Sequence, residues 1–320
     1  MTYAFDPELA ETISQLPQAD DPTDYLAARE MLKQFLPTMP SYEPRVPLEV
    51  RDVTIPGPPD SPDVAVRIYT PPVAGHPLPA VLYIHGGGFT VGNVAIFDTV
   101  TRQMAAEVGA VVISVDYRLA PEDPYPAAVE DCYAALVWTA RSARDLGIDT
   151  ARIAVCGGSA GGGLAAAMAL LARDRGGPAL CFQFLGIPEL DDRLDTPSMR
   201  AYVDTPLFNR PAAEFSWDCY LGGPGIRGTA AVSCYAAPSR AEDLSGLPPA
   251  YVTTSQFDPL RDEGIDYAQR LAQANVPTEL ILYPGTFHGS TAIAAQAAIS
   301  QREGADLLNA LRRALTPKTT

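Results

Sequence analysis

The strongest chemical signal in the sequence is a serine in a glycine-rich turn. Ser159 lies in the pentapeptide GGSAG at positions 157–161, between a predicted strand and a predicted helix. A GxSxG motif in that setting is typical of a nucleophile elbow, a tight turn that exposes the serine hydroxyl and needs small neighbours. A phosphate-binding loop is the alternative, but no Lys-Ser or Lys-Thr pair follows the glycines. We therefore predict nucleophilic catalysis by Ser159.

A second glycine cluster, HGGG at positions 85–88, follows a short apolar strand. The transition state of acyl transfer carries an oxyanion, and glycines let backbone N–H groups approach such a group without steric cost. We expect the N–H groups of Gly87, Gly88 and Ala160 to form this oxyanion hole. His85 is expected to fix the glycine loop rather than to act as a base.

The chain has only three histidines from which a serine nucleophile could draw its general base. His76 lies between prolines in a linker-like stretch, and His85 belongs to the glycine loop. His288, in YPGTFHGS, directly follows a predicted strand, at the edge where ligands bind in α/β sheets. It also completes the order Ser, Asp, His along the chain, so His288 is the expected base.

The acid partner should lie between the serine and the histidine, at the end of a strand. Asp258 does so, directly after YVTTSQF, and its carboxylate would orient the imidazole and stabilise the protonated ring. Asp262 is the competitor, although it is also placed to cap the helix that begins there. Asp191 and Asp192 are expected to be turn residues.

These residues must be positioned by a parallel sheet with helices on both faces. Short, continuously apolar segments alternate with helical patterns, which is typical of an α/β protein. Strands are predicted at 50–57 and 64–70 as an antiparallel hairpin, and at 79–85, 110–117, 152–156, 179–187, 249–255 and 278–283. Helices are predicted at 24–36 with Asp24 as N-cap, and at 98–109, 127–146, 164–175, 212–220, 262–274 and 300–314.

The chain is expected to form one body and a cap. Residues 46–188 and 226–320 are the first and second parts of the α/β body, and residues 1–45 are an N-terminal helical cap segment. Residues 189–225 are a turn-rich, aromatic cap insertion. Loop aromatic side chains are candidates for an apolar substrate pocket, with packing between cap and body as the alternative for most of them. They are Phe89, Tyr202, Phe208, Trp217 and Phe287.

Composition excludes several classes of partner. The net charge of −15 argues against nucleic acid and anionic membranes, which need a positive face. The first residues are acidic, unlike an export signal, and no apolar run is long enough to span a bilayer, so a cytoplasmic protein is expected. Few histidines and five scattered cysteines give little to build a metal site from. No metal or organic cofactor is expected, the expected partner is a small-molecule substrate, and a homo-oligomer is left open.

Together these motifs resemble the hormone-sensitive-lipase-like branch of α/β-hydrolase carboxylesterases. The resemblance begins near residue 50 and includes HGGGF, YRLAPEDPYPAAVEDCYAAL, GGSAGGGLA, DLSGLPPAYV, DPLRDEG and YPGTFHG. IPELDDRLDTPSM, YAAPSRA and PGTFHGS are most similar to bacterial acetyl esterases of the heroin esterase type. One departure is Gly158, where the branch often has Asp.

The resemblance implies an α/β-hydrolase fold with an eight-stranded, mostly parallel sheet flanked by helices and a helical cap. It also implies a serine carboxylesterase that hydrolyses short-chain, acetyl-type esters of bulky alcohols or phenols. An amidase or peptidase with the same triad is one alternative. A non-catalytic small-molecule-binding protein on this fold is the other, and the presence of Ser159, Asp258 and His288 argues against it.

Overall fold

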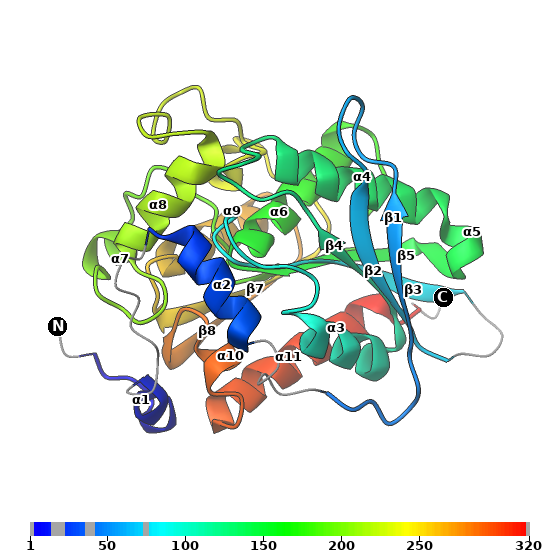
Figure 1. Ribbon diagram of the computed structural model, residues 1–320, viewed down its shortest axis with the longest axis horizontal. Helices are drawn as coiled ribbons and strands as arrows, with labels where there is room; N and C mark the ends of the chain where they lie inside the picture. Colours follow the sequence, from blue (N-terminus) through cyan, green and yellow to red (C-terminus); the bar gives the residue numbers. More distant parts are fainter. Residues whose placement is uncertain (1–2, 14–22, 36–41, 73–76, 318–320) are drawn as a thin grey trace.

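An eight-stranded sheet forms the centre of the molecule (Figure 1), with strand order β1-β2-β4-β3-β5-β6-β7-β8. The computed structural model describes residues 3–13, 23–35, 42–72 and 77–317. The strands span Glu49–Ile55 (β1), Val64–Thr70 (β2), Leu78–Ile84 (β3), Val111–Asp116 (β4), Ile148–Gly158 (β5), Phe182–Gly186 (β6), Ala250–Phe257 (β7) and Thr278–Phe287 (β8).

Most of the sheet is parallel. Strand β1 pairs antiparallel with β2, and β2 pairs antiparallel with β4, which confirms the predicted hairpin. Every other neighbouring pair is parallel. Parallel strands are covered on both faces, which explains why β3 is almost entirely buried along its sequence LPAVLYI.

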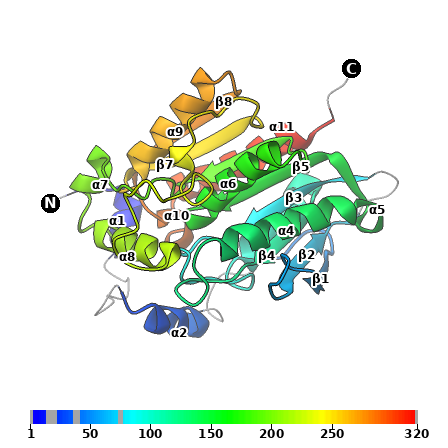
Figure 2. The same cartoon turned by 90° about the horizontal axis from the view of Figure 1, so that it is seen from above.

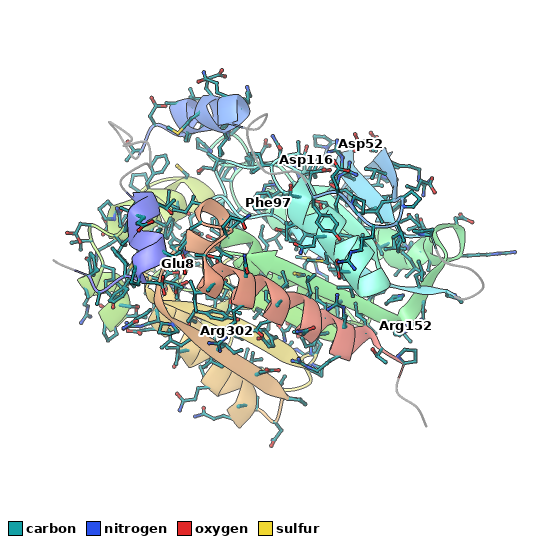
Figure 3. All side chains as sticks on the ribbon, turned by 90° about the horizontal axis from the view of Figure 1, so that it is seen from below. Glu8, Asp52, Phe97, Asp116, Arg152 and Arg302 are labelled. Atoms are coloured by element: carbon teal, nitrogen blue, oxygen red, sulfur yellow. The ribbon has the colours of Figure 1, made fainter. Side chains whose placement is uncertain are left out.

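Helices cover both faces of this sheet. They span Pro7–Ile13 (α1), Tyr25–Phe35 (α2), Asp98–Met104 (α3), Ala127–Arg141 (α4), Ala143–Leu146 (α5), Ala160–Asp174 (α6), Pro197–Ala201 (α7), Arg210–Leu221 (α8), Arg261–Gln273 (α9), Ser290–Ile293 (α10) and Ala298–Leu315 (α11), with a π turn at Ala105–Gly109 (η2) and a 3-10 turn at Pro238–Arg240 (η3). Helices α4, α6 and α9 pack on one face (Figure 2), and α3 and α11 pack on the other, where Figure 3 shows α11 lying over the strands.

Alternate residues of each central strand supply the two apolar cores. In β3, Leu82 and Ile84 join the core under α4, α6 and α9, whereas Val81 and Tyr83 join the core under α11. This alternation follows from the two-residue period of a strand. It leaves the strand ends, rather than the faces of the sheet, as the place for polar chemistry.

Helix α6 begins four residues before the predicted start at 164. Glycines 161–163 lower helix propensity, but here they allow the helix to approach the sheet closely. A Cβ atom on Gly161 would lie 2.1 Å from the carbonyl oxygen of Ile84, and one on Gly163 would lie 2.1 Å from that of Glu189. Tight packing therefore outweighs propensity at this helix start.

The N-terminal segment packs beside the end of β8. The backbone N–H of Asp6 donates to the carbonyl oxygen of Gly285 at 3.0 Å, and the Phe5 and Phe287 rings lie 5.2 Å apart, centroid to centroid. Leu9 is fully buried against Phe287. The Glu8 carboxylate accepts the N–H of Ala298 at the start of α11. Helix α1, which the sequence pattern did not predict, thus braces the strand that leads into His288.

Helix α2 confirms the predicted helix and its cap, because the Asp24 carboxylate accepts the N–H of Ala27 at 2.8 Å. His76, the expected linker histidine, lies outside the described residues. Helices α7 and α10, each of five residues or fewer, were not predicted, since segments so short carry little periodic signal.

Candidate active site

Ser159 occupies a sharp turn between β5 and α6. Its backbone has φ +58° and ψ −125°, a left-handed conformation that is strained for a residue with a side chain. Positions 157 and 161 must be glycine, because a Cβ atom on Gly157 would lie 2.2 Å from the carbonyl oxygen of Gly161 and one on Gly161 would lie 2.1 Å from that of Ile84. At Gly158 the nearest atom would be 3.9 Å away, so this position has room for the Asp often found in the resembling branch.

The structure brings the three expected triad residues together. The Ser159 Oγ lies 2.8 Å from His288 Nε2, and His288 Nδ1 lies 2.8 Å from Asp258 Oδ2. Asp258 is fully buried, and its other carboxylate oxygen accepts the backbone N–H of Leu260 at 2.8 Å. The imidazole therefore donates from Nδ1 to the acid and presents Nε2 as acceptor to the serine hydroxyl, the arrangement that a serine nucleophile needs.

His288 is held ready to gain a proton. Burial lowers its pKa, but the charge of Asp258 and its hydrogen bond outweigh burial and raise the pKa above the ordinary 6.5. Glu189 and Glu303 add to this effect when they are ionised. The positive charge that forms on the ring during proton transfer is thus stabilised within the site.

The other acidic candidates lie elsewhere. Asp262 accepts the backbone N–H of Ser198 at 2.8 Å and pairs with Arg261. It therefore neither caps its own helix nor belongs to the triad. Asp191 accepts the N–H of Arg193 two residues on, as a turn residue does. Asp192 is more than a turn residue, because it is fully buried in an ion pair with Arg240 at 2.5 Å.

The HGGG loop lies against the serine turn. A Cβ atom on Gly86 would be 2.8 Å from the carbonyl oxygen of Gly158, so the two glycine clusters are in contact. Gly87 and Gly88 have φ of +127° and +53°, conformations that side chains rarely adopt. Ala160 is the first residue of α6, so its N–H has no acceptor within the helix.

His85 lies in a closed packing site rather than in the triad. It is fully buried between two rings, with centroids 4.2 Å away for Tyr117 and 5.6 Å for Phe97. Its Nδ1–H donates to the Gly86 carbonyl oxygen at 2.8 Å, and Tyr117 donates to the carbonyl of His85 itself. Burial lowers the pKa of His85 to about 4, so the ring is neutral.

Of the five aromatic pocket candidates, Phe208 lies beside the triad, with its ring centroid 4.7 Å from that of His288. Phe89 and Trp217 are almost fully buried, and Phe89 stacks on Tyr220 at 3.9 Å. Phe287 is fully buried in the cluster that holds the N-terminal segment. Tyr202 packs near Phe257 and accepts a hydrogen bond from Arg261.

Sequence reasoning missed Glu189, which is fully buried next to the triad. Its backbone N–H donates to the carbonyl oxygen of Ser159 at 3.1 Å, and its side chain contacts Ser216 of α8 at 2.9 Å. Burial raises the pKa of the Glu189 carboxyl to about 7. The signal that could have found it is a lone carboxyl group within the apolar stretch IPEL, directly after a buried strand.

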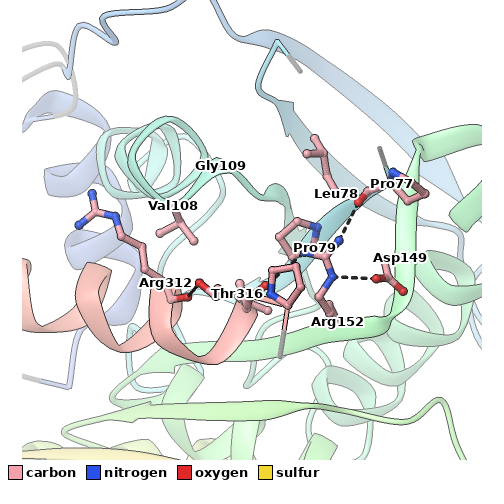
Figure 4. Close-up of a pocket in the computed structure, with 11 residues that line it drawn as sticks. Pro77, Leu78, Pro79, Val108, Gly109, Asp149, Arg152, Arg312 and Thr316 are labelled. Carbon is pink, nitrogen blue, oxygen red and sulfur yellow. Dashed lines mark hydrogen bonds and ion pairs between the residues drawn. The ribbon is translucent and has the colours of Figure 1, made fainter. Parts of the chain in front are cut away.

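A cavity of about 770 Å³ lies at the amino ends of β3 and β5, at the edge of the sheet opposite the triad (Figure 4). It is lined in part by Leu78 and Asp149, near the starts of β3 and β5, and by Thr316 after α11. Arg152 donates to the Asp149 carboxylate and to the Pro77 carbonyl oxygen, both at 2.7 Å. The Arg152 charge is therefore paired within the protein, and no triad residue lines this cavity.

Within the described residues, no group of three or more His, Cys, Asp or Glu side chains is placed to hold a metal ion. No helix in the described part of the chain is long and apolar enough to cross a membrane.

The fold and this site define the class. A family described as alpha/beta hydrolase fold matches residues 81–292, and the chain belongs to this family. Among solved structures, a bacterial heroin esterase is 48% identical, with a TM-score of 0.94 over 98% of this chain and 99% of that one. Carboxylesterase NlhH of Mycobacterium tuberculosis is 43% identical over 90% of this chain and 89% of its own length. Ethyl acetate hydrolase of Pseudomonas putida is 35% identical over 72% of each chain.

These comparisons confirm three expectations. The chain has the α/β-hydrolase fold, it is similar to the expected group of bacterial esterases, and it is a carboxylic ester hydrolase.

Proposed function

We propose that Ser159, His288 and Asp258 form the catalytic triad of this carboxylesterase. The observation that carries the proposal is the continuous hydrogen-bonded chain from the serine hydroxyl through the imidazole to a buried carboxylate, with both links at 2.8 Å. In acylation, Ser159 Oγ bonds to the ester carbonyl carbon while its proton moves to His288 Nε2. Asp258 holds the ring and stabilises its positive charge.

The tetrahedral intermediate places its oxyanion at the N–H groups of Gly87, Gly88 and Ala160. It collapses when the ester C–O bond breaks and His288 gives its proton to the departing alcohol. Water then attacks the acyl-enzyme, with His288 taking one proton from the water and returning it to Ser159 Oγ. The carboxylic acid leaves and the resting state is restored. These reaction steps use only groups of this chain, the ester and water.

The substrate is proposed to be a short-chain, acetyl-type ester of a bulky alcohol or phenol. Phe208 beside His288 and the neighbouring Leu207, with 51% of its surface exposed, offer an apolar approach to the serine. The relatives named ethyl acetate hydrolase and heroin esterase differ widely in the size of the alcohol in their named esters. A short acyl site combined with an adaptable alcohol site would accommodate both.

Two segments are proposed to form the cap, residues 1–45 and 189–225, over a body made of 46–188 and 226–320. Arg29 of α2 donates to the carbonyl oxygens of Thr90 and Ala120, which ties the first segment to the loop after HGGG. Ser216 and Phe208 of the second segment contact Gly88 and His288. A cytoplasmic location is proposed because the five cysteines are scattered in the sequence and none of them, all lying among the described residues, forms a disulfide.

The test is Ser159→Ala with p-nitrophenyl acetate as substrate. We expect the pre-steady-state burst of p-nitrophenol to disappear and kcat to fall by about 10⁶. Turnover retained by the variant would refute the nucleophile. A series of acyl chains from acetate to decanoate should peak at the short end, and a maximum at long micellar esters would refute the acyl preference. Matched ester and anilide substrates separate an esterase from an amidase.

A further inference from the structure

Ser216 of α8 contacts the oxyanion loop and a buried carboxyl group at once. Its Oγ lies 3.0 Å from the carbonyl oxygen of Gly88 and 2.9 Å from Glu189 Oε1. Ser216 is 3% exposed and Glu189 is fully buried, so bulk water cannot complete their hydrogen bonds. A serine hydroxyl has a single hydrogen to donate. It cannot donate to both oxygens, and one of the two contacts needs a different donor.

A proton on Glu189 removes this conflict. The protonated carboxyl donates to Ser216 Oγ, and Ser216 then donates its own hydrogen to the Gly88 carbonyl. The surroundings favour this state, because Glu189 Oε2 has no hydrogen-bond partner among the described residues and a buried anion so poorly solvated is costly. Burial raises the pKa of the Glu189 carboxyl, which agrees with the need for a second hydrogen in these two contacts.

We propose that Glu189, protonated in the resting enzyme, and Ser216 form a hydrogen-bond relay that holds the Gly88 peptide and so positions the oxyanion loop. The inference rests on the proposed oxyanion hole of Gly87, Gly88 and Ala160. Three consecutive glycines have wide conformational freedom, and a loop of this kind needs an outside contact to keep one geometry. The relay supplies that contact from the cap insertion.

Glu189 also connects the two halves of the site. Its backbone N–H donates to the Ser159 carbonyl oxygen, and through Ser216 its side chain reaches Gly88. A displacement of Glu189 would therefore move the nucleophile turn and the oxyanion loop relative to each other. Both Glu189 and Ser216 are positioning residues, because they act through the Gly88 peptide and the Ser159 carbonyl rather than on the reacting atoms.

The test compares Ser216→Ala and Glu189→Leu with Glu189→Gln. The first two remove the relay, and kcat for p-nitrophenyl acetate should fall about 10- to 100-fold, with KM changed less than about twofold. The double variant should lose no more than either single variant, since all three break one relay. Glutamine is neutral and keeps a donor, so Glu189→Gln should retain kcat within about threefold.

A second measurement separates positioning from general damage. A trifluoromethyl ketone forms a tetrahedral adduct that uses the oxyanion hole, and its affinity should fall in parallel with kcat. The control is Ser239→Ala, because Ser239 is buried to a similar degree and its hydroxyl has no partner among the described residues. Titration of reactive serine with a phosphonate counts folded sites in every sample, so a folding loss is not mistaken for slow catalysis.

Each outcome decides the proposal. If Glu189→Gln loses as much kcat as Glu189→Leu, Glu189 acts as an anion and the protonated relay is wrong. If Ser216→Ala keeps wild-type kcat and inhibitor affinity, no relay positions the loop, and this result stands even if Glu189→Leu does not fold. Loss of inhibitor affinity without loss of kcat would also overturn it. A Ser159→Ala variant that still turns over would instead refute the proposed function on which the relay rests.

Discussion

His85 and His288 are both buried, yet they have opposite chemical characters. His85 stacks between Tyr117 and Phe97 and donates to a backbone carbonyl, and burial lowers its pKa to about 4. His288 faces Asp258, whose charge and hydrogen bond outweigh burial and raise its pKa. The partner at Nδ1, a neutral carbonyl in one case and a carboxylate in the other, decides whether a buried imidazole can accept a proton.

The difference also separates two roles at one sheet edge. Both residues directly follow strands, β3 and β8, at the carboxyl end of the parallel sheet. A position directly after a strand is therefore not enough to make a histidine a general base. The difference is that Nε2 of His288 contacts the Ser159 hydroxyl, whereas Nε2 of His85 has no partner among the described residues.

Replacing each histidine gives the largest test of this contrast. His288→Ala should lower kcat by about 10⁶, because the serine loses its base. His85→Ala should keep the burst of p-nitrophenol and lose no more than about 10² in kcat, through displacement of the glycine loop. Stopped-flow measurement of the burst distinguishes the two. Loss of the burst in His85→Ala would show that the roles have been wrongly divided.

Asp258→Asn tests the carboxylate directly. The amide leaves the shape of the site but cannot hold the Nδ1–H tautomer or stabilise the charged ring, and kcat should fall by about 10⁴. Steady-state kinetics with p-nitrophenyl acetate measures it, with Asp262→Asn as the matched control that should stay near wild type. Equal losses in the two variants would contradict the assignment of the acid.

The free energy of unfolding should depend on His85, although this residue is not expected to take part in the chemistry. His85→Ala leaves a cavity between two rings and removes a buried hydrogen bond, at a cost of about 3 kcal/mol in the free energy of unfolding. Urea denaturation measures the loss. A His85→Ala protein as stable as the wild type would mean that the stacked site can close without the ring.

The pH dependence of kcat/KM gives the smallest effect. His288 must be neutral to accept the serine proton, so kcat/KM should fall about tenfold per pH unit below its pKa and reach a plateau above it. Since the pKa is raised, the acid limb should lie above 6.5. His85→Ala should not move the limb, because a ring with a pKa of about 4 is neutral throughout. If the acid limb shifted in His85→Ala, His85 rather than His288 would be the group that titrates in catalysis.

Most of the sheet and the triad could be predicted from the sequence, since apolar strands and the GGSAG and HGGG turns are local patterns. Helix starts were less predictable. Glycines 161–163 disfavour a helix locally, and only their contact with β3 and Glu189 explains why α6 includes them. The Glu189–Ser216 contact joins residues from separate segments, and no local pattern marks such a pair.

The brace between the N-terminal segment and the end of β8 has a consequence for synthesis. Phe5 and Leu9 are made roughly 280 residues before their partner Phe287. A ribosome that adds 5–20 residues per second separates the two events by roughly 15 to 60 seconds. During that interval Phe5 and Leu9 lack their apolar partner at the end of β8, so this contact forms only when the segment that carries His288 has been made.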